Sequence, residues 1–145
     1  MKQAFTIIEL VFVIVVLGIL ASVALPKFGA TKNMADVSKA RSDVAAIRSS
    51  ILTERQSQLI KGTNSYIPQL SDNTTTLFTG NGTRKLLTYG IVSGTADGKW
   101  SVVTNVTTNS YNFKANGTNI QFDYNTTSGT FGCDRSNDTC KQIVD

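Results

Sequence analysis

The feature that most constrains this chain is an apolar run near its N-terminus, from Phe5 to Leu25, that contains one charged residue, Glu9. At about 1.5 Å per helical residue the run spans roughly 31 Å, which is the thickness of a bilayer core. A carboxylate inside such a span costs about 2.5–3.5 kcal/mol on membrane-insertion scales. A partner must offset that cost, so the function of this segment depends on what Glu9 contacts.

Two simple interpretations of the run leave something unexplained. Ser22-Val23-Ala24 has the small-x-small form of a secretory cleavage site, but the apolar stretch is longer than a signal peptide needs and contains Glu9. A plain single-span anchor explains the length and leaves Glu9 without a partner.

A third interpretation accounts for both the length and the charge. A short basic leader with Lys2 ends in a small residue, Ala4, and is followed by Phe5-Thr-Ile-Ile-Glu9 and a long apolar stretch. This pattern resembles the class III leader of the type IV pilin superfamily, and we favour it over the other two. The resemblance covers about the first thirty residues closely and the rest of the chain only in architecture.

The resemblance implies how the N-terminus is processed. A membrane-embedded prepilin peptidase would cut on the cytoplasmic side, between Ala4 and Phe5, and so remove residues 1–4 as a leader peptide. The same enzyme would methylate the new amine of Phe5. The family usually has Gly before the cut, where this chain has Ala4.

Cleavage also suggests a role for Glu9 in assembly. It leaves a cationic amine on Phe5, and Glu9 lies four residues further along the same helix face. One chain alone can form this pair. Pairing of Glu9 with the Phe5 amine of a neighbouring chain does more, because an unpaired buried charge is costly and mis-registered subunits are rejected. The alternative is a Glu9 side chain that only reaches the lipid headgroups.

Gly18 and Pro26 mark the end of the apolar span. Pro26 has no N–H to donate to the Ser22 carbonyl, so we expect a kink or a helix break there. Gly18 lowers helix stability by about 1 kcal/mol relative to Ala. In similar pilins this segment loosens on filament assembly. A compatible alternative is that Gly18, Ala21 and Ser22 allow close helix packing.

The composition argues against catalysis. The 145 residues include no His, which removes the commonest general base and metal ligand and excludes a Ser-His-Asp or Cys-His enzyme. No glycine-rich phosphate loop follows a strand, and no CxxC pair occurs. We therefore predict no catalytic residue, no metal site and no cofactor, and the chain is not an enzyme.

The net charge of +4 belongs to the N-terminal part of the chain. Residues 1–61 hold eight basic and four acidic residues, whereas residues 62–145 hold six of each. No clustered basic face is visible, so no nucleic-acid partner is predicted. Lys27 and Lys32 are expected near lipid headgroups. Two lysines after the span against Lys2 before it weakly favour a cytoplasmic C-terminal part, by the positive-inside rule. The leader and the cysteines favour the reverse, and we therefore place the C-terminal part outside the cytoplasm.

The two cysteines, Cys133 and Cys140, are separated by six residues. If the C-terminal part of the chain is exported, they are expected to form a disulfide. Closing so short a loop contributes roughly 2–3 kcal/mol in the chain-entropy model. Similar pilins pin their C-terminal segment with such a bridge, although many secretion pseudopilins lack one.

The pattern after the apolar span predicts an α+β fold. Residues 27–61 continue the 5–26 helix as an amphipathic helix that ends at Gly62, and residues 62–145 form an antiparallel sheet head. The expected apolar stripe of the helix consists of Met34, Val37, Ala40, Val44, Ile47 and Ile51. The expected packing anchors of the connecting region 63–83 are Tyr66, Ile67, Leu70, Leu77 and Phe78.

Four or five short strands are predicted in the head, with one face covering the helix stripe. They are 87–91, 100–106, 111–115, 120–124 and 130–133. Asn116-Gly117 between two of them is a strong hairpin signal. Asn125, with Asp123 two residues before it, is the one Asn-x-Thr site that also fits an acid-dependent glycosylation motif. The oxygens of Asp134, Asn137 and Asp138 have no calcium-ligand spacing, so a solvated loop is favoured there.

The sequence therefore predicts a non-enzymatic building block of a type IV pilus-like filament. It would be held in a bacterial inner membrane by a single span with a periplasmic head, and then assembled as a homo-oligomer or mixed pilin filament. Its partners would be the prepilin peptidase, the lipid bilayer and an inner-membrane assembly platform with a separate ATPase. A type II secretion pseudopilus and a type IV pilus both remain open. The alternative is a membrane-anchored periplasmic binding or adhesion module that does not polymerise; an exported enzyme is disfavoured by the missing His.

Overall fold

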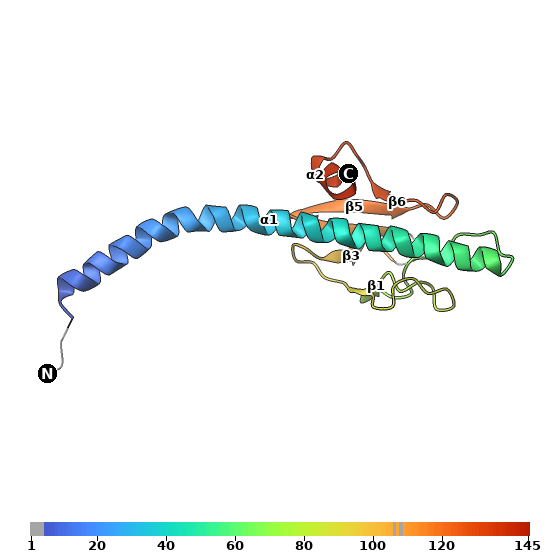
Figure 1. Cartoon of the computed structure of the whole chain (residues 1–145), viewed down its shortest axis with the longest axis horizontal. Helices are drawn as coiled ribbons and strands as arrows, with labels where there is room; N and C mark the ends of the chain where they lie inside the picture. Colours follow the sequence, from blue (N-terminus) through green and yellow to red (C-terminus); the bar gives the residue numbers. More distant parts are fainter. Residues whose placement is uncertain (1–4, 106, 108) are drawn as a thin grey trace. The chain divides into compact units, whose positions relative to one another are not determined.

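The computed structural model describes residues 5–105, 107 and 109–145 and shows one long helix followed by short strands and a second, short helix (Figure 1). This is the predicted α+β arrangement. The elements are α1 (Ile7–Ile60), β1 (Thr76–Leu77), β2 (Ile91–Val92), β3 (Trp100–Val102), β4 (Ser110–Ala115), β5 (Thr118–Tyr124), β6 (Phe131–Cys133) and α2 (Asp138–Val144).

The chain divides into two compact units, Met1–Met34 and Ala35–Asp145. The first unit holds the apolar half of α1, and the second holds the amphipathic half of α1 with the sheets and α2. From here on, the head means this second unit, Ala35–Asp145, so it includes the amphipathic half of α1 as well as residues 62–145.

The amphipathic half of α1 supplies one wall of the head core. Ala40, Val44, Ile47 and Ile51 recur at helical spacing and are at most 1% exposed, as the sequence predicts. Met34 was expected on the same stripe but is 74% exposed, because the packed core begins only after it, at the half-buried Val37.

The main sheet is an antiparallel meander in the order β3-β4-β5-β6. Side chains of β4 and β5 alternate between buried and more exposed, so one face of the sheet meets the core and the other meets solvent. The predicted hairpin is confirmed: Asn116 and Gly117 both have positive φ, at 50° and 74°, as a two-residue turn between right-twisted strands requires.

Two of the predicted strands are shorter than expected. Of 87–91, only Ile91 is in a strand, β2, which pairs with β1 in a separate two-stranded ladder. Leu87 lies outside any strand, and its N–H donates to the Phe78 carbonyl. Of 100–106, β3 covers Trp100–Val102, and Val106 lies outside the described residues. Strand pairing needs a neighbour at each residue, and these segments have one over only part of their length.

An aromatic cluster fills the space between the helix and the sheet. Phe78, Trp100 and Phe131 lie with ring centroids 5.5–6.1 Å apart, and each is at most 2% exposed. Such aromatic pairs add to the area they bury. Of the predicted anchors of the connecting region, Ile67, Leu70, Leu77 and Phe78 are buried and Tyr66 is half-buried.

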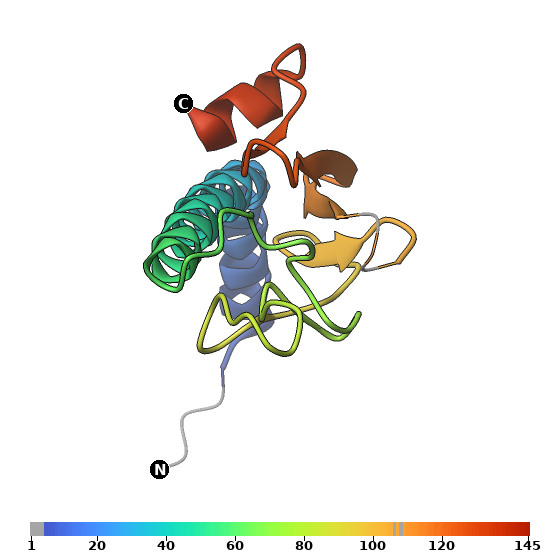
Figure 2. The same cartoon turned by 90° about the vertical axis from the view of Figure 1, so that its right-hand side faces the viewer.

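Within the head, α1 runs past the sheet with different segments on its two flanks (Figures 1 and 2). Helix α2 and strand β6 lie on one flank, and the segment that contains β1 lies on the other. Helix α2 was not predicted. It begins after Asn137, whose side chain accepts from the N–H groups of Thr139 and Cys140.

Candidate functional site

The first candidate site is the apolar half of α1. Its large apolar side chains are exposed in the single chain, from 37% at Val16 to 84% at Ile7. The helix is long and apolar enough, by length and composition, to cross a membrane, and its most apolar window has no buried residue. Soluble monomers rarely expose a contiguous apolar surface of this extent, so the segment requires lipid or other protein chains around it.

Glu9 is held at the start of this helix by Thr6. The Thr6 backbone N–H and hydroxyl both donate to Oε2 of Glu9, at 3.2 and 3.0 Å, and the Glu9 N–H donates to the Thr6 hydroxyl at 3.3 Å. This reciprocal pair is a capping box, in which a Thr just before the helix and a Glu three residues later satisfy each other's N–H groups. It also places a carboxylate at the positive end of the helix dipole.

The capping box leaves one side of the Glu9 carboxylate available. Both hydrogen bonds to the carboxylate end on Oε2, and among the described residues none is found on Oε1. A cation from another chain can therefore approach Oε1 while Thr6 keeps the side chain in place.

The predicted cleavage site lies at the edge of the described chain. Ala4 is outside the described residues, and Phe5 is exposed and precedes the first turn of α1. Cleavage after Ala4 and methylation of Phe5 therefore stay predictions.

The helix passes through both residues that were expected to weaken it. α1 is helical at Gly18 and at Pro26, and a Cβ added at Gly18 would meet nothing within 4 Å. The Ser22 hydroxyl, one turn before Pro26, donates to the Ile19 carbonyl at 2.7 Å. Loosening of this segment concerns the assembled state and stays a prediction.

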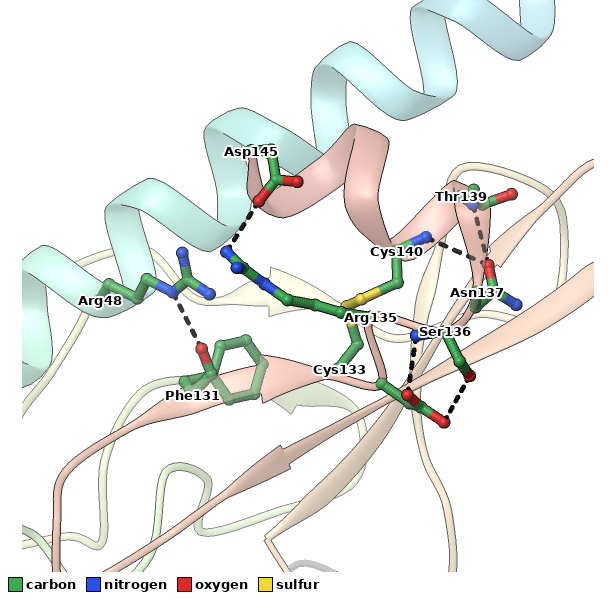
Figure 3. The surroundings of a disulfide bond; sticks show 10 residues. Arg48, Phe131, Cys133, Arg135, Ser136, Asn137, Thr139, Cys140 and Asp145 are labelled. Carbon is green, nitrogen blue, oxygen red and sulfur yellow. Dashed lines mark hydrogen bonds and ion pairs between the residues drawn. A yellow bond between two sulfur atoms is a disulfide. The ribbon is translucent and has the colours of Figure 1, made fainter.

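The C-terminal cysteines form the predicted disulfide, with their Cα atoms 6.0 Å apart (Figure 3). It joins the end of β6 to the first turn of α2. The Arg41 guanidinium donates to the Gln142 carbonyl near the other end of α2. The short helix is therefore held at both ends.

The polar oxygens of this C-terminal loop are used internally. The backbone N–H and the hydroxyl of Ser136 donate to Asp134, and these hydrogen bonds lower the pKa of that carboxyl. Asp138 pairs with Lys141. Asn137 caps α2 by accepting from Thr139 and Cys140 (Figure 3). Within the part of the chain that the structure describes, no group of three or more His, Cys, Asp or Glu residues is placed to hold a metal ion.

The Asn-x-Thr motifs have a local structural explanation. In several of them the Asn side-chain oxygen accepts the N–H two residues later, which makes an Asx-turn. Asn125 accepts from Thr127 and also from Ser128, at the turn between β5 and β6. The same bond occurs at Asn73, Asn105 and Asn137.

Two features of the site were not inferred from the sequence. The first is Thr6, although Thr-x-x-Glu before an apolar helix is a readable capping-box signal. The second is the bidentate pair of Arg84 with Glu54, both contacts at 2.6 Å, which joins α1 to the segment after β1. Glu54 is 6% exposed, and the separation of 30 positions in the sequence leaves no local signal for the pair.

Comparison with known proteins identifies relatives over part of the chain. It is 42% identical over 50 residues to the type II secretion system core protein G of Dickeya chrysanthemi and to that of Aeromonas hydrophila. Each match covers 34% of this chain and 33% or 35% of the relative, so the similarity spans about a third of either protein. No family model and no solved structure matches the chain.

The geometry and the similarity agree on the class of protein. A long helix with an exposed apolar first half, joined to a head built on an antiparallel sheet, is a pilin-like architecture. The similarity to core protein G covers about a third of either chain, and it supports the resemblance of the N-terminal segment to the type IV pilin superfamily.

Proposed function

We propose that this chain is a structural subunit of a type II secretion pseudopilus or a closely related type IV pilus-like filament. The exposed apolar half of α1, with a single carboxylate in its first turn, carries the proposal. The span would sit in the inner membrane before assembly and in the filament core afterwards, with the heads outside. The similarity to core protein G favours the secretion pseudopilus over a pilus.

The proposed maturation follows the leader. A prepilin peptidase removes residues 1–4 and methylates Phe5, and the resulting cation pairs with Oε1 of Glu9 in a neighbouring subunit. The position of Oε1 supports this step, because Thr6 occupies Oε2 and no hydrogen bond from residues 5–105, 107 or 109–145 reaches Oε1. The energy for assembly comes from a separate cytoplasmic ATPase. The head lies in the periplasm and performs no chemistry.

Three substitutions separate the charge of Glu9 from its capping role. Glu9→Gln keeps an acceptor for the capping box and removes the charge, Glu9→Ala removes both, and Thr6→Ala removes the cap and keeps the charge. We expect both Glu9 variants to lose filaments and Thr6→Ala to retain some. Filament yield is measured by shearing cells that carry the assembly machinery and quantifying the released subunit by immunoblot.

The rival, a membrane-anchored module that never polymerises, predicts a different result. Such an anchor inserts at least as well without Glu9, and no sheared fraction appears with the natural chain. Filaments from Glu9→Gln at the natural yield would refute the register argument. Absence of filaments from the natural chain would refute the filament itself.

A further inference from the structure

One face of α1 in the head carries a row of three arginines, and among the described residues none of them forms an ion pair with a carboxylate. Arg41, Arg48 and Arg55 are spaced seven residues apart and so share a helix face. Each guanidinium donates to a neutral acceptor rather than to a carboxylate, and Figure 3 shows this for Arg48 and strand β6. The acceptors are the Gln142 carbonyl, the Phe131 carbonyl and the Asn64 side chain.

An exposed apolar row lies beside the arginines. Leu52 and Leu59 follow Arg48 and Arg55 by four residues, and they are 56% and 50% exposed. Leu52 and Arg48 line a groove of about 290 Å³ whose other wall is the turn into β6. The lining residues are Arg48, Leu52, Gly129, Thr130 and Phe131. We call this surface the Arg48–Leu52 groove.

The segment that contains β1 and β2 carries a second exposed patch, with apolar side chains and one carboxylate. Tyr89 is 89% exposed and Val92 is 65% exposed. Asp72 is connected to this segment through Thr79: the Thr79 hydroxyl donates to Asp72 at 3.0 Å, and the Thr79 methyl packs against Gly90, the residue after Tyr89. Among the described residues, Asp72 accepts only from neutral groups. We call this surface the Tyr89 patch.

We propose that the Tyr89 patch of one copy of this chain docks into the Arg48–Leu52 groove of the next copy. This contact rests on the proposed filament and specifies the head surfaces that build it. Tyr89 enters the groove against Leu52, and the Asp72 carboxylate approaches the arginine row.

Three observations support this occupant. The charges are opposite, since the row has three guanidinium groups and the patch has one carboxylate with no cationic neighbour among the described residues. Exposed Tyr and Arg are the residue types that dominate binding at interface centres. The groove is built on the turn into β6 and the patch belongs to the segment that contains β1 and β2, and these two parts of the backbone lie on different flanks of α1. Two different complementary surfaces make a head-to-tail contact that propagates as an open filament.

A hollow that adjoins the groove contains one acid, which limits where the carboxylate of the partner copy is placed. Asp123 lines the adjoining hollow with Arg48 and accepts from Ser110 and Gln121. The Asp72 carboxylate of the incoming copy is therefore placed towards the Arg55 end of the row, away from Asp123.

Disulfide trapping in the assembled filament tests the contact. The double variant Leu52→Cys/Tyr89→Cys is expressed with the assembly machinery, oxidised, and run on a denaturing gel without reductant. We expect a ladder of dimers, trimers and higher species, because each chain offers one cysteine to each neighbour. The matched control is Thr53→Cys/Tyr89→Cys, whose exposed position 53 faces the other flank of α1; it should stay monomeric.

The remaining outcomes contradict the contact in distinct ways. Filaments without a Leu52–Tyr89 ladder would overturn the contact and leave the filament intact. A dimer from either single variant would indicate a two-fold contact instead. No filaments from the natural chain would overturn both proposals.

Leu52→Ser and Tyr89→Ser give an independent measurement. Both side chains are exposed, so the melting temperature of the head should not change. Filament yield should fall roughly tenfold or more, as for an interface hot spot. An unchanged yield would overturn the contact.

Discussion

The two halves of α1 show how one helix can need two different environments. Ile14 in the first half is 57% exposed, whereas Ile47 in the second half is fully buried. The residue type and the secondary structure are the same, and only the surroundings differ. The head supplies its own apolar environment from the sheet, while the first half must obtain one from lipid or from other subunits. The packed core makes the head a candidate for independent folding, and the exposed half makes assembly necessary.

The largest test of this contrast places one acid in each half. Ile47→Asp buries an unpaired charge in the head core and should cost about 4 kcal/mol or more, which unfolds a domain of ordinary stability. Ile14→Asp should leave the head folded and reduce membrane insertion, because a second charge in the span costs about 2.5–3.5 kcal/mol. Proteolysis of the head and fractionation of membranes measure the two effects, and each variant is the other's control. Equal effects on the head would contradict the division.

The next effect comes from the buried ion pair inside the head. Arg84→Met leaves Glu54 without its partner in a site where it is 6% exposed. Loss of one partner from a buried pair costs about 3–5 kcal/mol. Lys39→Met is the matched control, because the Lys39–Asp43 pair is more exposed, at 45% for the Lys39 side chain and 20% for the Asp43 side chain, and an ion pair near the surface contributes about 0–1 kcal/mol. Urea unfolding measures both, and similar values for the two variants would mean that burial of Glu54 is unimportant.

The disulfide should contribute a smaller, local stabilisation. Replacing Cys133 and Cys140 together by Ser should lower the free energy of unfolding by about 2–3 kcal/mol. Because the bridge joins β6 to α2, hydrogen exchange should speed up first in α2 and leave the apolar half of α1 unchanged. Uniform loss of protection across the head would argue against a local role.

The smallest effect is a dependence on alkaline pH that only the head should show. Burial raises the pKa of Tyr111 to about 12 and that of Tyr124 to about 12, above their ordinary value of 10.0. A group whose pKa is raised on folding stabilises the folded state below its unfolded pKa. That stability is lost as the pH rises from about 10 towards 12. The first unit has no Tyr, so its helix signal should persist while the head unfolds. Tyr124→Phe should weaken the dependence.

The division of α1 into an exposed apolar half and a half that packs in the head can largely be predicted from the sequence, because it depends on hydrophobic periodicity and on short-range signals. The stripe from Ala40 to Ile51 and the Asn116-Gly117 hairpin follow from spacing and from turn chemistry, and both are confirmed. Met34 was assigned to the stripe because periodicity says which face a residue shares and not how far the core extends.

The remaining features depend on contacts between distant segments. Helix α2 is too short to form alone and exists where the disulfide and Arg41 hold it. Glu54 pairs with Arg84, and the Leu87 N–H donates to the Phe78 carbonyl. No local sequence pattern connects the partners in either contact. The capping role of Thr6 could have been predicted from the Thr-x-x-Glu spacing, but Thr6 was interpreted only as part of the leader motif.

The most direct test of the central claim is the intact mass of the protein purified from its native membrane, with fragmentation of its N-terminus. We expect a chain that begins at methylated Phe5 and is two daltons lighter than its reduced form, because of the Cys133–Cys140 disulfide. A chain that keeps Met1, or one that begins at Leu25, would contradict it, because an unprocessed anchor or a secreted domain has no Phe5 amine for Glu9 to bind.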